Sequence, residues 1–439
     1  MKAASLVVCA LLARADAPVV DDGYSADRAV RRAIEESPLL DSLAHRIDEE
    51  EGPRTLGLLF ENPELRIASR HLERTVRPTS TVADVLENSS VGVRVPVPSI
   101  KAMGFEQSVR ARHVDATRAD LDEARRELAA RVRVLHATLL NLDERLVVVD
   151  AQIVLGQRTA ELVAKRIEVG VATRFDESIS ALDQAAVQTE KESLLAERRL
   201  AEAELRGLLA LTAEDAFALV ADAKSPCESV KELHIDGAPV EEAGQGALLA
   251  IDLPRSAPAL DALDARISEE ENARVAAVVD LIPWVRFFEL EYRLGTERID
   301  DSVRFQMGVP LPLVNFNQDD VREHTARIAR LEAERRHEVS LIGGELRAHR
   351  ENLMGQHALL SLYRGTTEPV IAQSLSLVDE ALALGEGDPV QMTYVTARAL
   401  KAKKNALETQ LRCDEAAIAW LARSGRDPVL AGGDGRTGL

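Results

Sequence analysis

Few residues of this chain have the types and spacing that chemistry requires. Glu334 and His337 have the E-x-x-H spacing of carboxylate-bridged metal sites in helical bundles, but such sites need a second copy and no other E-x-x-H occurs. A solvated helix face explains the pair better. The glycine-rich stretch Gly432–Gly438 is followed by no helix that would let it hold a phosphate. With no nucleophile–base pair in view, the sequence predicts a protein that is not an enzyme and carries no metal and no cofactor.

The composition indicates long helices rather than an ordinary compact domain. Of 439 residues, 3% are aromatic and 29% are charged, and Ala, Leu, Glu and Arg are abundant. The formal net charge of −19 argues against a nucleic-acid partner. The three cysteines, Cys9, Cys227 and Cys413, form no CxxC motif and predict neither a disulfide framework nor a zinc site.

The N-terminus predicts an export signal over residues 1–17. Lys2 precedes the apolar run Ala3–Ala13, and Ala15-Asp16-Ala17 supplies a small-x-small cleavage site. The alternative is the disordered start of a cytosolic protein. No later stretch has the roughly 18 apolar residues of a spanning helix. An exported chain of this kind can enter a membrane only as a closed β-barrel.

The chain contains two copies of one unit. The phrase VPVP at 95–98 returns as VPLP at 309–312, and SPLL at 37–40 returns as APAL at 257–260. Nearly constant offsets at separate landmarks predict a tandem duplication. We assign the first repeat to 18–210, a linker to 211–245, the second repeat to 246–425 and a flexible tail to 426–439.

Each repeat has the same expected order of elements: a helix, two strands, a long helix and a second helix. In the first repeat we expect strands at about 62–76 and 88–98, the long helix at 101–169 and the last helix at 176–211. In the second repeat we expect strands at about 282–296 and 301–312, the long helix at 313–384 and the last helix at 389–423. The strands alternate apolar and polar residues over about 9–11 positions, which suits a tilted strand that crosses a bilayer. Trp284, Phe288 and Tyr292 share one strand face that suits a lipid interface.

Heptad rows predict that the long helices form a coiled coil. One row of the first repeat comprises Leu121, Leu128, Leu135, Leu142 and Val149. A second row, from Val132 to Ile167, is offset by four positions, and two such rows make one seam. The corresponding row of the second repeat, which begins at Val339, is weaker because His349 and Gln356 stand where apolar residues are expected. We expect Pro369 to bend that helix.

A helix of roughly 68 residues extends on the order of 100 Å, which is too long for a compact core. It must lie against another helical element of similar length. The last helix of each repeat is about half as long, so the first and last helices stacked end to end would match it. We expect a rod of paired helices with four strands at one end. Four strands cannot close a barrel and would leave two open edges in lipid, so copies of the chain must assemble. Each Pro-x-Pro ends a strand hairpin because proline cannot donate to the ladder.

With these features in place, the sequence resembles the TolC-type outer-membrane efflux channels, the outer membrane factor family. The resemblance covers about 24–425 and is carried by SPLL, ENPELRI, VPVPSI, VPLPLVNF and RIEVGVATRFD, while the turn LGEGDPVQ resembles the heavy-metal, CzcC/CusC-like branch. The resemblance implies a mainly α fold with a small β part. It also implies a homotrimer with a twelve-stranded barrel in the outer membrane and a helical tunnel in the periplasm. The implied partners are a periplasmic adaptor protein and an inner-membrane efflux transporter.

In that family the turns at the tunnel tip meet the adaptor through an R-x-x-x-G-x-x-S/T pattern. Arg166, Gly170 and Thr173 fit this pattern in the first repeat. Gly170 is expected to turn the chain at positive φ, and Arg166 offers a fork of donors to the docking backbone. The alternative is that Arg166 is only a solvated helix residue. The second repeat departs from the pattern, and its tip residues are Gly385 and Asp388.

Family channels close at the tip, with acidic residues six and nine positions after the glycine of the second repeat. Here Gln391 and Tyr394 stand at those positions. Acidic residues nearby could still supply an aperture with negative charge: Asp176, Asp379, Glu380, Glu386 and Asp388. Such a constriction would favour cations, and the alternative is that these charges are simply solvated.

Two functions from different classes follow from the sequence. One is a passive conduit in the outer membrane whose helical part lies in the periplasm. The other is a periplasmic or surface coiled-coil scaffold without a pore, in which the strands only cap helices. The face formed by Trp284, Phe288 and Tyr292 favours the conduit, whereas the low aromatic content favours the scaffold.

Overall fold

The computed structural model describes residues 23–51, 62–69, 89–97, 100–212, 214–222, 224–228, 257–280, 282, 284–293, 301–310, 317–384, 389–425 and 427–431. The chain divides into two compact units. Unit 1 comprises Met1–Leu40, Ala124–Ser256 and Leu341–Leu439, and unit 2 comprises Asp41–Glu123 and Ala257–Ser340. Each unit contains residues of both repeats, so the repeats fold together rather than as separate domains.

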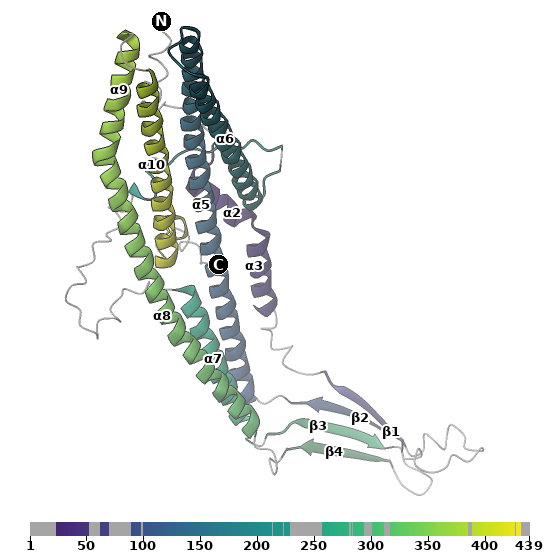
Figure 1. Cartoon of the computed structure of the whole chain (residues 1–439). Coiled ribbons are helices and arrows are strands. Elements are labelled where there is room, and N and C mark those ends of the chain that lie inside the picture. Colours follow the sequence, from purple (N-terminus) through teal and green to yellow (C-terminus); the bar gives the residue numbers. More distant parts are fainter. Residues whose placement is uncertain are drawn as a thin grey trace, which may run out of the picture. The chain divides into compact units, whose positions relative to one another are not determined.

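Helices account for most of the described residues (Figure 1). The helices are α2 (Ala26–Glu36), α3 (Pro38–Glu51), α5 (Ile100–Glu168), α6 (Arg174–Leu208), α7 (Pro258–Val279), α8 (Gln318–Leu362), η7 (Tyr363–Thr367), α9 (Glu368–Leu384), α10 (Pro389–Ser424) and α11 (Pro428–Ala431). The strands are β1 (Glu64–Ser69), β2 (Ser89–Pro96), β3 (Phe287–Arg293) and β4 (Ser302–Gly308). None of the described helices is both long enough and apolar enough to cross a membrane.

The first helical stretch is broken into α2 and α3. Ser37, which separates them, has an extended backbone with ψ 113°. The cause is Pro38, because a proline disfavours helical geometry in the residue before it. The Ser37 hydroxyl then accepts a hydrogen bond from the Leu40 amide at 3.4 Å. The sequence predicted one continuous helix here, and that prediction is wrong because the helix is interrupted at Ser37.

The predicted coiled-coil seam of α5 is confirmed. Leu135, Leu142 and Val149 of the first row are buried, and so are Val132 and Leu139 of the second row. In unit 1 the seam packs against both a short helix and a long one. The cluster around Leu139 includes Val30 of α2 and Leu205 of α6, and the cluster around Val149 includes Leu194 of α6.

Polar contacts also join α5 to helices of both repeats in unit 1. Arg198 of α6 lies 2.5 Å from the Asp143 carboxylate of α5. The Asn141 side-chain amide donates to the Leu407 carbonyl of α10 at 2.6 Å. Lys404 of α10 contacts Glu190 of α6 at 2.8 Å. Helices from the two repeats therefore lie side by side in this unit (Figure 1).

The long helix of the second repeat does not end at Pro369. The helical backbone runs from Gln318 to Leu384, but residues Tyr363–Thr367 form a π-helical turn. The Glu368 amide, just before the proline, donates to the Tyr363 carbonyl five residues earlier. This wider turn lets a residue without an N–H be included in a continuing helix. Burial raises the pKa of Tyr363 to about 12, with a further contribution from the negative charge of Glu368.

Part of the predicted linker is tied to the helices of unit 1. Cys227 forms a disulfide with Cys413 of α10, across 186 positions of sequence. The Cys227 amide also donates to the buried Asp414 carboxylate at 2.9 Å. The sequence predicted no disulfide framework from three cysteines without a motif, and it did not anticipate this single bond. Local spacing cannot reveal a pair that only tertiary packing brings together.

Residues assigned by sequence to a flexible tail are also packed in unit 1. Asp427 is buried and pairs with Arg133 of α5 at 2.9 Å, and Arg133 contacts Asp27 of α2 at 2.7 Å. A buried arginine is expensive to leave unpaired. This ion triad holds the start of α11 and the start of α2 on the same helix.

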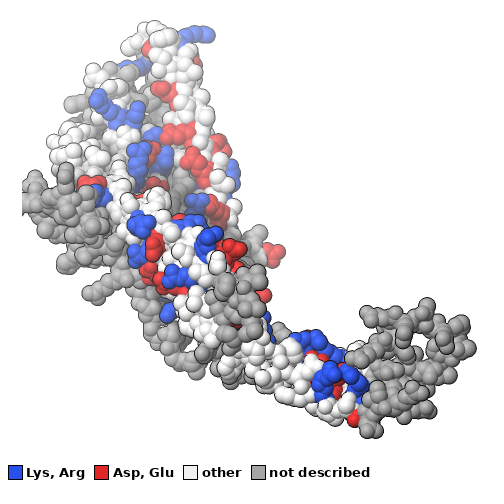
Figure 2. Space-filling view, turned by 90° about the horizontal axis from the view of Figure 1, so that it is seen from below, with Lys and Arg blue, Asp and Glu red and all other residues white. Residues whose placement is uncertain are grey.

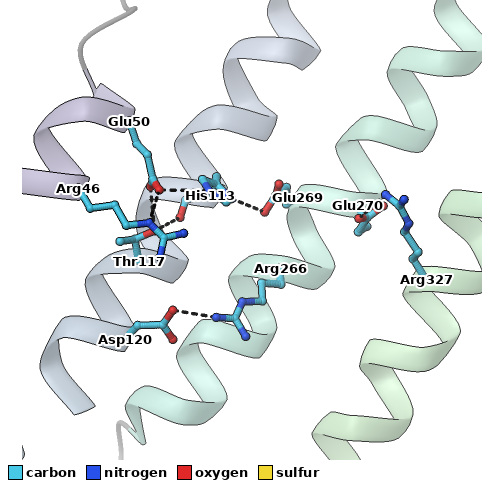
Figure 3. A network of polar contacts seen from close by, with 9 residues as sticks. All are labelled: Arg46, Glu50, His113, Thr117, Asp120, Arg266, Glu269, Glu270 and Arg327. Atoms are coloured by element: carbon cyan, nitrogen blue, oxygen red, sulfur yellow. Dashed lines mark hydrogen bonds and ion pairs between the residues drawn. The ribbon is translucent and has the colours of Figure 1, made fainter. Parts of the chain in front are cut away.

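In unit 2 a polar network joins α3, α5, α7 and α8 (Figure 3). His113 of α5 lies between two carboxylates, Glu50 of α3 at 3.3 Å and Glu269 of α7 at 3.2 Å. The Thr117 hydroxyl donates to Glu50 at 2.8 Å. Burial alone would raise the pKa of Glu50, but hydrogen bonds from Thr117 and Arg46 and the charges of His113 and Arg46 outweigh it, so the pKa is lowered.

The network continues along α7. Asp120 of α5 pairs with Arg266 at 2.8 Å, and Glu270 contacts His324 and Arg327 of α8 at 2.6 and 3.4 Å. The helices of unit 2 thus face one another through ion pairs (Figure 3) and through buried apolar residues such as Val114 and Leu331, and the helices of unit 1 share larger apolar clusters besides their own ion pairs.

The four strands form one antiparallel sheet in the order β1-β2-β3-β4. Each repeat supplies one hairpin, and the hairpins join through β2 and β3, where Val93 pairs with Leu290. β2 ends at Pro96 and β4 ends at Gly308, shortly before Pro310. The expected role of the prolines at the strand ends is confirmed for these two described prolines; Pro98 and Pro312 lie outside the described residues.

Candidate functional site: a two-faced sheet and a helical tip

One face of the sheet is apolar from edge to edge. In antiparallel pairs, residues directly opposite each other project to the same face. Through the register of the three ladders, this rule places every large apolar strand side chain except that of Phe287 on one face. The members are Leu65, Ile67, Val91, Val93, Val95, Phe288, Leu290, Tyr292, Val303, Phe305 and Met307. Their exposed fractions range from 39% to 70%, so the part of the chain that the structure describes leaves this face largely open.

Of the aromatic residues predicted at a lipid interface, Phe288 and Tyr292 lie in strand β3, and Trp284 lies before it. Phe288 and Tyr292 lie on the apolar face, where Phe288 stacks on Phe305 with ring centroids 5.8 Å apart. The Tyr292 hydroxyl donates to Asp301 at 2.6 Å. Trp284 precedes β3, which begins only at Phe287, so it is not a strand residue as predicted. Its side chain is 36% exposed.

The opposite face of the sheet is charged and internally paired. Arg66 of β1 lies 3.6 Å from Glu289 of β3 and 3.4 Å from Glu64. Arg304 of β4 lies 3.9 Å from Glu291 of β3. The sheet is therefore amphipathic in the way that bilayer-crossing strands are, with lipid on one side and water on the other.

Two edges of the sheet are open. Within the described residues, β1 pairs only with β2 and β4 pairs only with β3. An edge strand presents unpaired N–H and C=O groups, and the hydrocarbon of a membrane offers them no partner. A sheet with an exposed apolar face and open edges is thus incomplete as a single chain.

The α5–α6 turn has a defined helix-ending geometry. Gly170 has φ 74°, which confirms the predicted left-handed conformation. The Val171 amide donates to the Arg166 carbonyl at 2.8 Å, and the Gly170 amide donates to the Ile167 carbonyl at 3.0 Å. These two bonds are the Schellman pattern, in which glycine closes a helix at no steric cost.

The next helix begins with a reciprocal cap. The Thr173 amide and hydroxyl both donate to the Asp176 carboxylate at 2.8 Å, and the Asp176 amide returns a bond to the Thr173 hydroxyl at 3.4 Å. The bonds from the Thr173 amide and hydroxyl lower the pKa of Asp176. Asp176, named by sequence as an aperture residue, therefore also helps to fix the turn.

Three exposed apolar side chains surround this turn and were not singled out from the sequence. Val169 and Val171 are each 71% exposed, and Phe175 is 72% exposed. A signal was present, because an apolar residue on each side of a turn glycine is unusual for a solvated loop. The predicted tip residues Arg166, Gly170 and Thr173 lie together within this exposed apolar turn.

The tip of the second repeat is only partly described. Gly385, Glu386 and Asp388 lie outside the described residues, and the backbone of Asp379 is helical. Glu380 and Gln391 are exposed, and Tyr394 is 64% exposed with its hydroxyl accepting from Arg398 at 3.3 Å. No group of His, Cys, Asp and Glu in the described ranges could hold a metal ion. Glu334 instead pairs with Arg330 at 2.7 Å.

No protein-family model and no curated protein sequence matches the chain. Solved structures do match. The outer-membrane channel OprN has a TM-score of 0.69 at 14% sequence identity, covering 92% of this chain and 90% of that chain. CusC, a protein that forms a transmembrane channel, has a TM-score of 0.69 at 11% identity, covering 91% of this chain and 91% of that one. VceC, an outer-membrane protein of Vibrio cholerae, has a TM-score of 0.66 at 15% identity, with 91% and 96% covered.

The chain has the fold of the TolC-type outer-membrane channels. The predicted fold class is thereby confirmed: a mainly α chain of long antiparallel helices with four strands, built from a duplicated unit. OprN and CusC match the chain with the same TM-score. The assignment to the heavy-metal, CzcC/CusC-like branch therefore stays a prediction.

Proposed function

We propose that this protein is the outer-membrane channel of a tripartite efflux system, a passive duct that leads from a periplasmic adaptor and an inner-membrane transporter to the exterior. The observation that carries the proposal is the two-faced sheet with two open edges. The TolC-type fold supports it. The duct performs no chemistry of its own, since it only has to enclose a passage.

The edges define how copies of the chain would join. Each unpaired backbone group in hydrocarbon costs several kcal/mol, so an open sheet of this kind is not stable in a bilayer. If β4 of one copy pairs with β1 of the next, three copies close a barrel of twelve strands. The apolar face then contacts lipid, and the charged face lines the passage.

The disulfide supports a location outside the cytosol. Cys227 and Cys413 are bonded and buried in an apolar cluster with Trp420 and Leu353. Structural disulfides form and persist in oxidising compartments, which include the bacterial periplasm. The helical part of the chain, including this bond, would lie in the periplasm.

The α5–α6 turn is the proposed docking point for the adaptor. Its rigid Schellman turn and capping box fix the backbone. Val169, Val171 and Phe175 supply exposed apolar area, and Arg166 adds a planar donor group. Gly385 and Asp388 of the second repeat complete the proposed tip. Asp176, Asp379, Glu380, Glu386, Gln391 and Tyr394 are the residues proposed near the periplasmic aperture.

The test of the channel is the mass and conductance of the protein extracted from outer membranes. We expect a detergent-solubilised trimer that conducts ions in a planar bilayer. If the protein is recovered only from the soluble periplasm and forms no trimer, the result supports the coiled-coil scaffold and contradicts the channel.

The docking proposal has its own test. Arg166→Ala should weaken crosslinking to the adaptor in cells while trimer mass and conductance stay unchanged. Arg158→Ala, an exposed arginine two turns earlier on α5, is the matched control. If both variants crosslink to the adaptor equally well, Arg166 is not part of the docking site.

A further inference from the structure

The charged face of the sheet carries more arginine than glutamate. Its described strand residues include Arg66, Arg94, Arg293 and Arg304, and the acidic ones are Glu64, Glu289 and Glu291. This face therefore has an excess of one positive charge in a chain whose net charge is −19. Figure 2 shows Lys and Arg atoms gathered over the strands, with fewer Asp and Glu atoms between them.

Two of the three acidic groups are shielded by the basic ones, whereas Glu64 on the edge strand β1 is 51% exposed and pairs with Arg66. Glu289 and Glu291 stand on the inner strand β3, and their side chains are only 12% and 16% exposed. Arg66 and Arg304 on the two edge strands are 48% and 51% exposed. Each of the two carboxylates has a guanidinium within 4 Å: Arg66 at 3.6 Å for Glu289, and Arg293 and Arg304 at 3.9 Å for Glu291. A solute on this side of the sheet would therefore meet more exposed guanidinium groups, those of Arg66 and Arg304, than exposed carboxylates, of which Glu64 is the one.

Arg94 is held flat on the same face. Its guanidinium carbon lies 3.5 Å from the centre of the Phe287 ring, a stacking contact that arginine favours. Phe287 in turn lies directly over Gly308, where a Cβ atom would come within 2.1 Å of the ring. Glycine is needed at position 308 for this packing. The arrangement fixes a guanidinium at the β2–β3 pairing rather than leaving it on a mobile side chain.

We propose that this arginine layer makes the barrel passage favour anions over cations, and so favour anionic solutes among the cargo. The proposal rests on the proposed channel, in which the charged face lines the water-filled passage. Rings of arginine and lysine select anions in pores because they lower the energy of an anion in the passage and raise that of a cation. Three copies repeat the excess charge around one lumen. The effect should be largest at low salt, because the Debye length is about 10 Å at 0.1 M and about 30 Å at 0.01 M.

The experiment is the reversal potential of single trimeric channels under a KCl gradient at low salt. The test variant is the double substitution Arg66→Gln and Arg304→Gln, which removes the two most exposed charges of the layer and inverts the excess to negative. The control is Arg66→Lys with Arg304→Lys, which keeps the charge. We expect the chloride-to-potassium permeability ratio to fall by about twofold or more in the glutamine variant, to stay unchanged in the lysine variant, and to differ less at 1 M salt.

The outcomes separate this inference from the proposed function. An unchanged ratio in a conducting glutamine variant overturns the arginine layer as a selectivity element but keeps the channel. A wild-type protein that forms no conducting trimer overturns both. If the double variant fails to assemble, Arg304→Gln alone decides the question in the same recording, since it removes a charge from the outer strand without touching the Arg66 pairs.

Discussion

The two repeats build the same long helical hairpin by different means. In the first repeat α5 runs for 69 residues, and its heptad seam is apolar and buried over much of its length. In the second repeat α8 and α9 are separated by a π-helical turn, and His349 and Gln356 are half-buried where the heptad expects apolar residues. The second hairpin has in return a disulfide, Cys227–Cys413, in a cluster with Trp420.

This difference teaches how a duplicated fold can diverge. A seam of leucine and valine is a sufficient constraint on two long helices, so the first repeat needs no crosslink. A seam interrupted by polar residues loses apolar burial. The covalent bond from Cys227 of the linker to Cys413 of α10 limits the consequence, because it restricts the unfolded chain whether or not the seam is apolar.

The largest expected effect is the loss of the crosslink. Cys227→Ala with Cys413→Ala should lower the free energy of unfolding by up to about 5 kcal/mol, the value that chain-entropy models give for a loop of this length. Hydrogen exchange should rise more in α8 and α10 than along the middle of α5. A uniform rise in exchange over both hairpins would contradict the division between seam and crosslink.

Substitution of a buried leucine by alanine in each repeat tests the comparison between the two repeats further. Leu139 in α5 and Leu353 in α8 are both fully buried, and each change to alanine should cost about 3 kcal/mol in urea unfolding. Leu353 lies in the cluster of the disulfide, whereas Leu139 does not. In double-mutant cycles with the crosslink, Leu353→Ala should show a coupling of about 1 kcal/mol and Leu139→Ala almost none. Equal coupling at both sites would show that the crosslink acts on the whole molecule.

The turn glycine of the first hairpin gives a smaller effect. Gly170→Ala should destabilise the α5–α6 tip by about 1 kcal/mol, because alanine is strained at φ 74° even though its Cβ would meet no atom within 4 Å. Gly344→Ala, inside α8 with equally open space, is the matched control and should stabilise by about 0.5–1 kcal/mol. Thermal unfolding measures both changes. A gain in stability for Gly170→Ala would rule out the left-handed turn.

The smallest expected effects are changes in the free energy of unfolding with pH. The changes that arise from Glu50 and from Asp414 have opposite signs. The pKa of Glu50 is lowered, so its contribution is complete above the unfolded pKa, near 4.5, and is lost as the pH falls through the folded pKa. The pKa of Asp414 is raised, chiefly by burial, so stability should fall as the pH rises through its folded pKa.

Urea midpoints measured against pH separate the two groups. Glu50→Gln should cost about 1 kcal/mol at neutral pH and flatten the acid limb below about pH 4.5, and Asp414→Asn should remove the decline that begins as the pH rises above the unfolded pKa of Asp414. Parallel curves for a variant and the wild type would mean that the carboxylate concerned does not titrate differently on folding.

Periodicity made much of this fold predictable. Heptad rows gave the buried face of α5, and alternation gave the apolar face of the sheet, because both depend only on local geometry. The break at Ser37 was not predicted, although the proline at position 38 indicates it. The disulfide and the π-helical turn depend on packing between distant segments, and local patterns do not report such packing. The arginine layer was missed because it requires the register of β1 on β2, of β2 on β3 and of β3 on β4, which combines strands of both repeats.

The bond between Cys227 and Cys413 also changes the covalent connectivity of the sheet. It closes a macrocycle of polypeptide that contains α7, β3, β4, α8, η7, α9 and α10 as far as Cys413, while β1 and β2 lie on the open part of the chain. A protease cut anywhere inside the macrocycle leaves one molecule on a gel until a reducing agent is added. A cut between β1 and β2 separates two fragments at once. The β1–β2 hairpin and the β3–β4 hairpin have similar sequence patterns. After a protease cut they can be distinguished by whether the fragments separate only when a reducing agent is added.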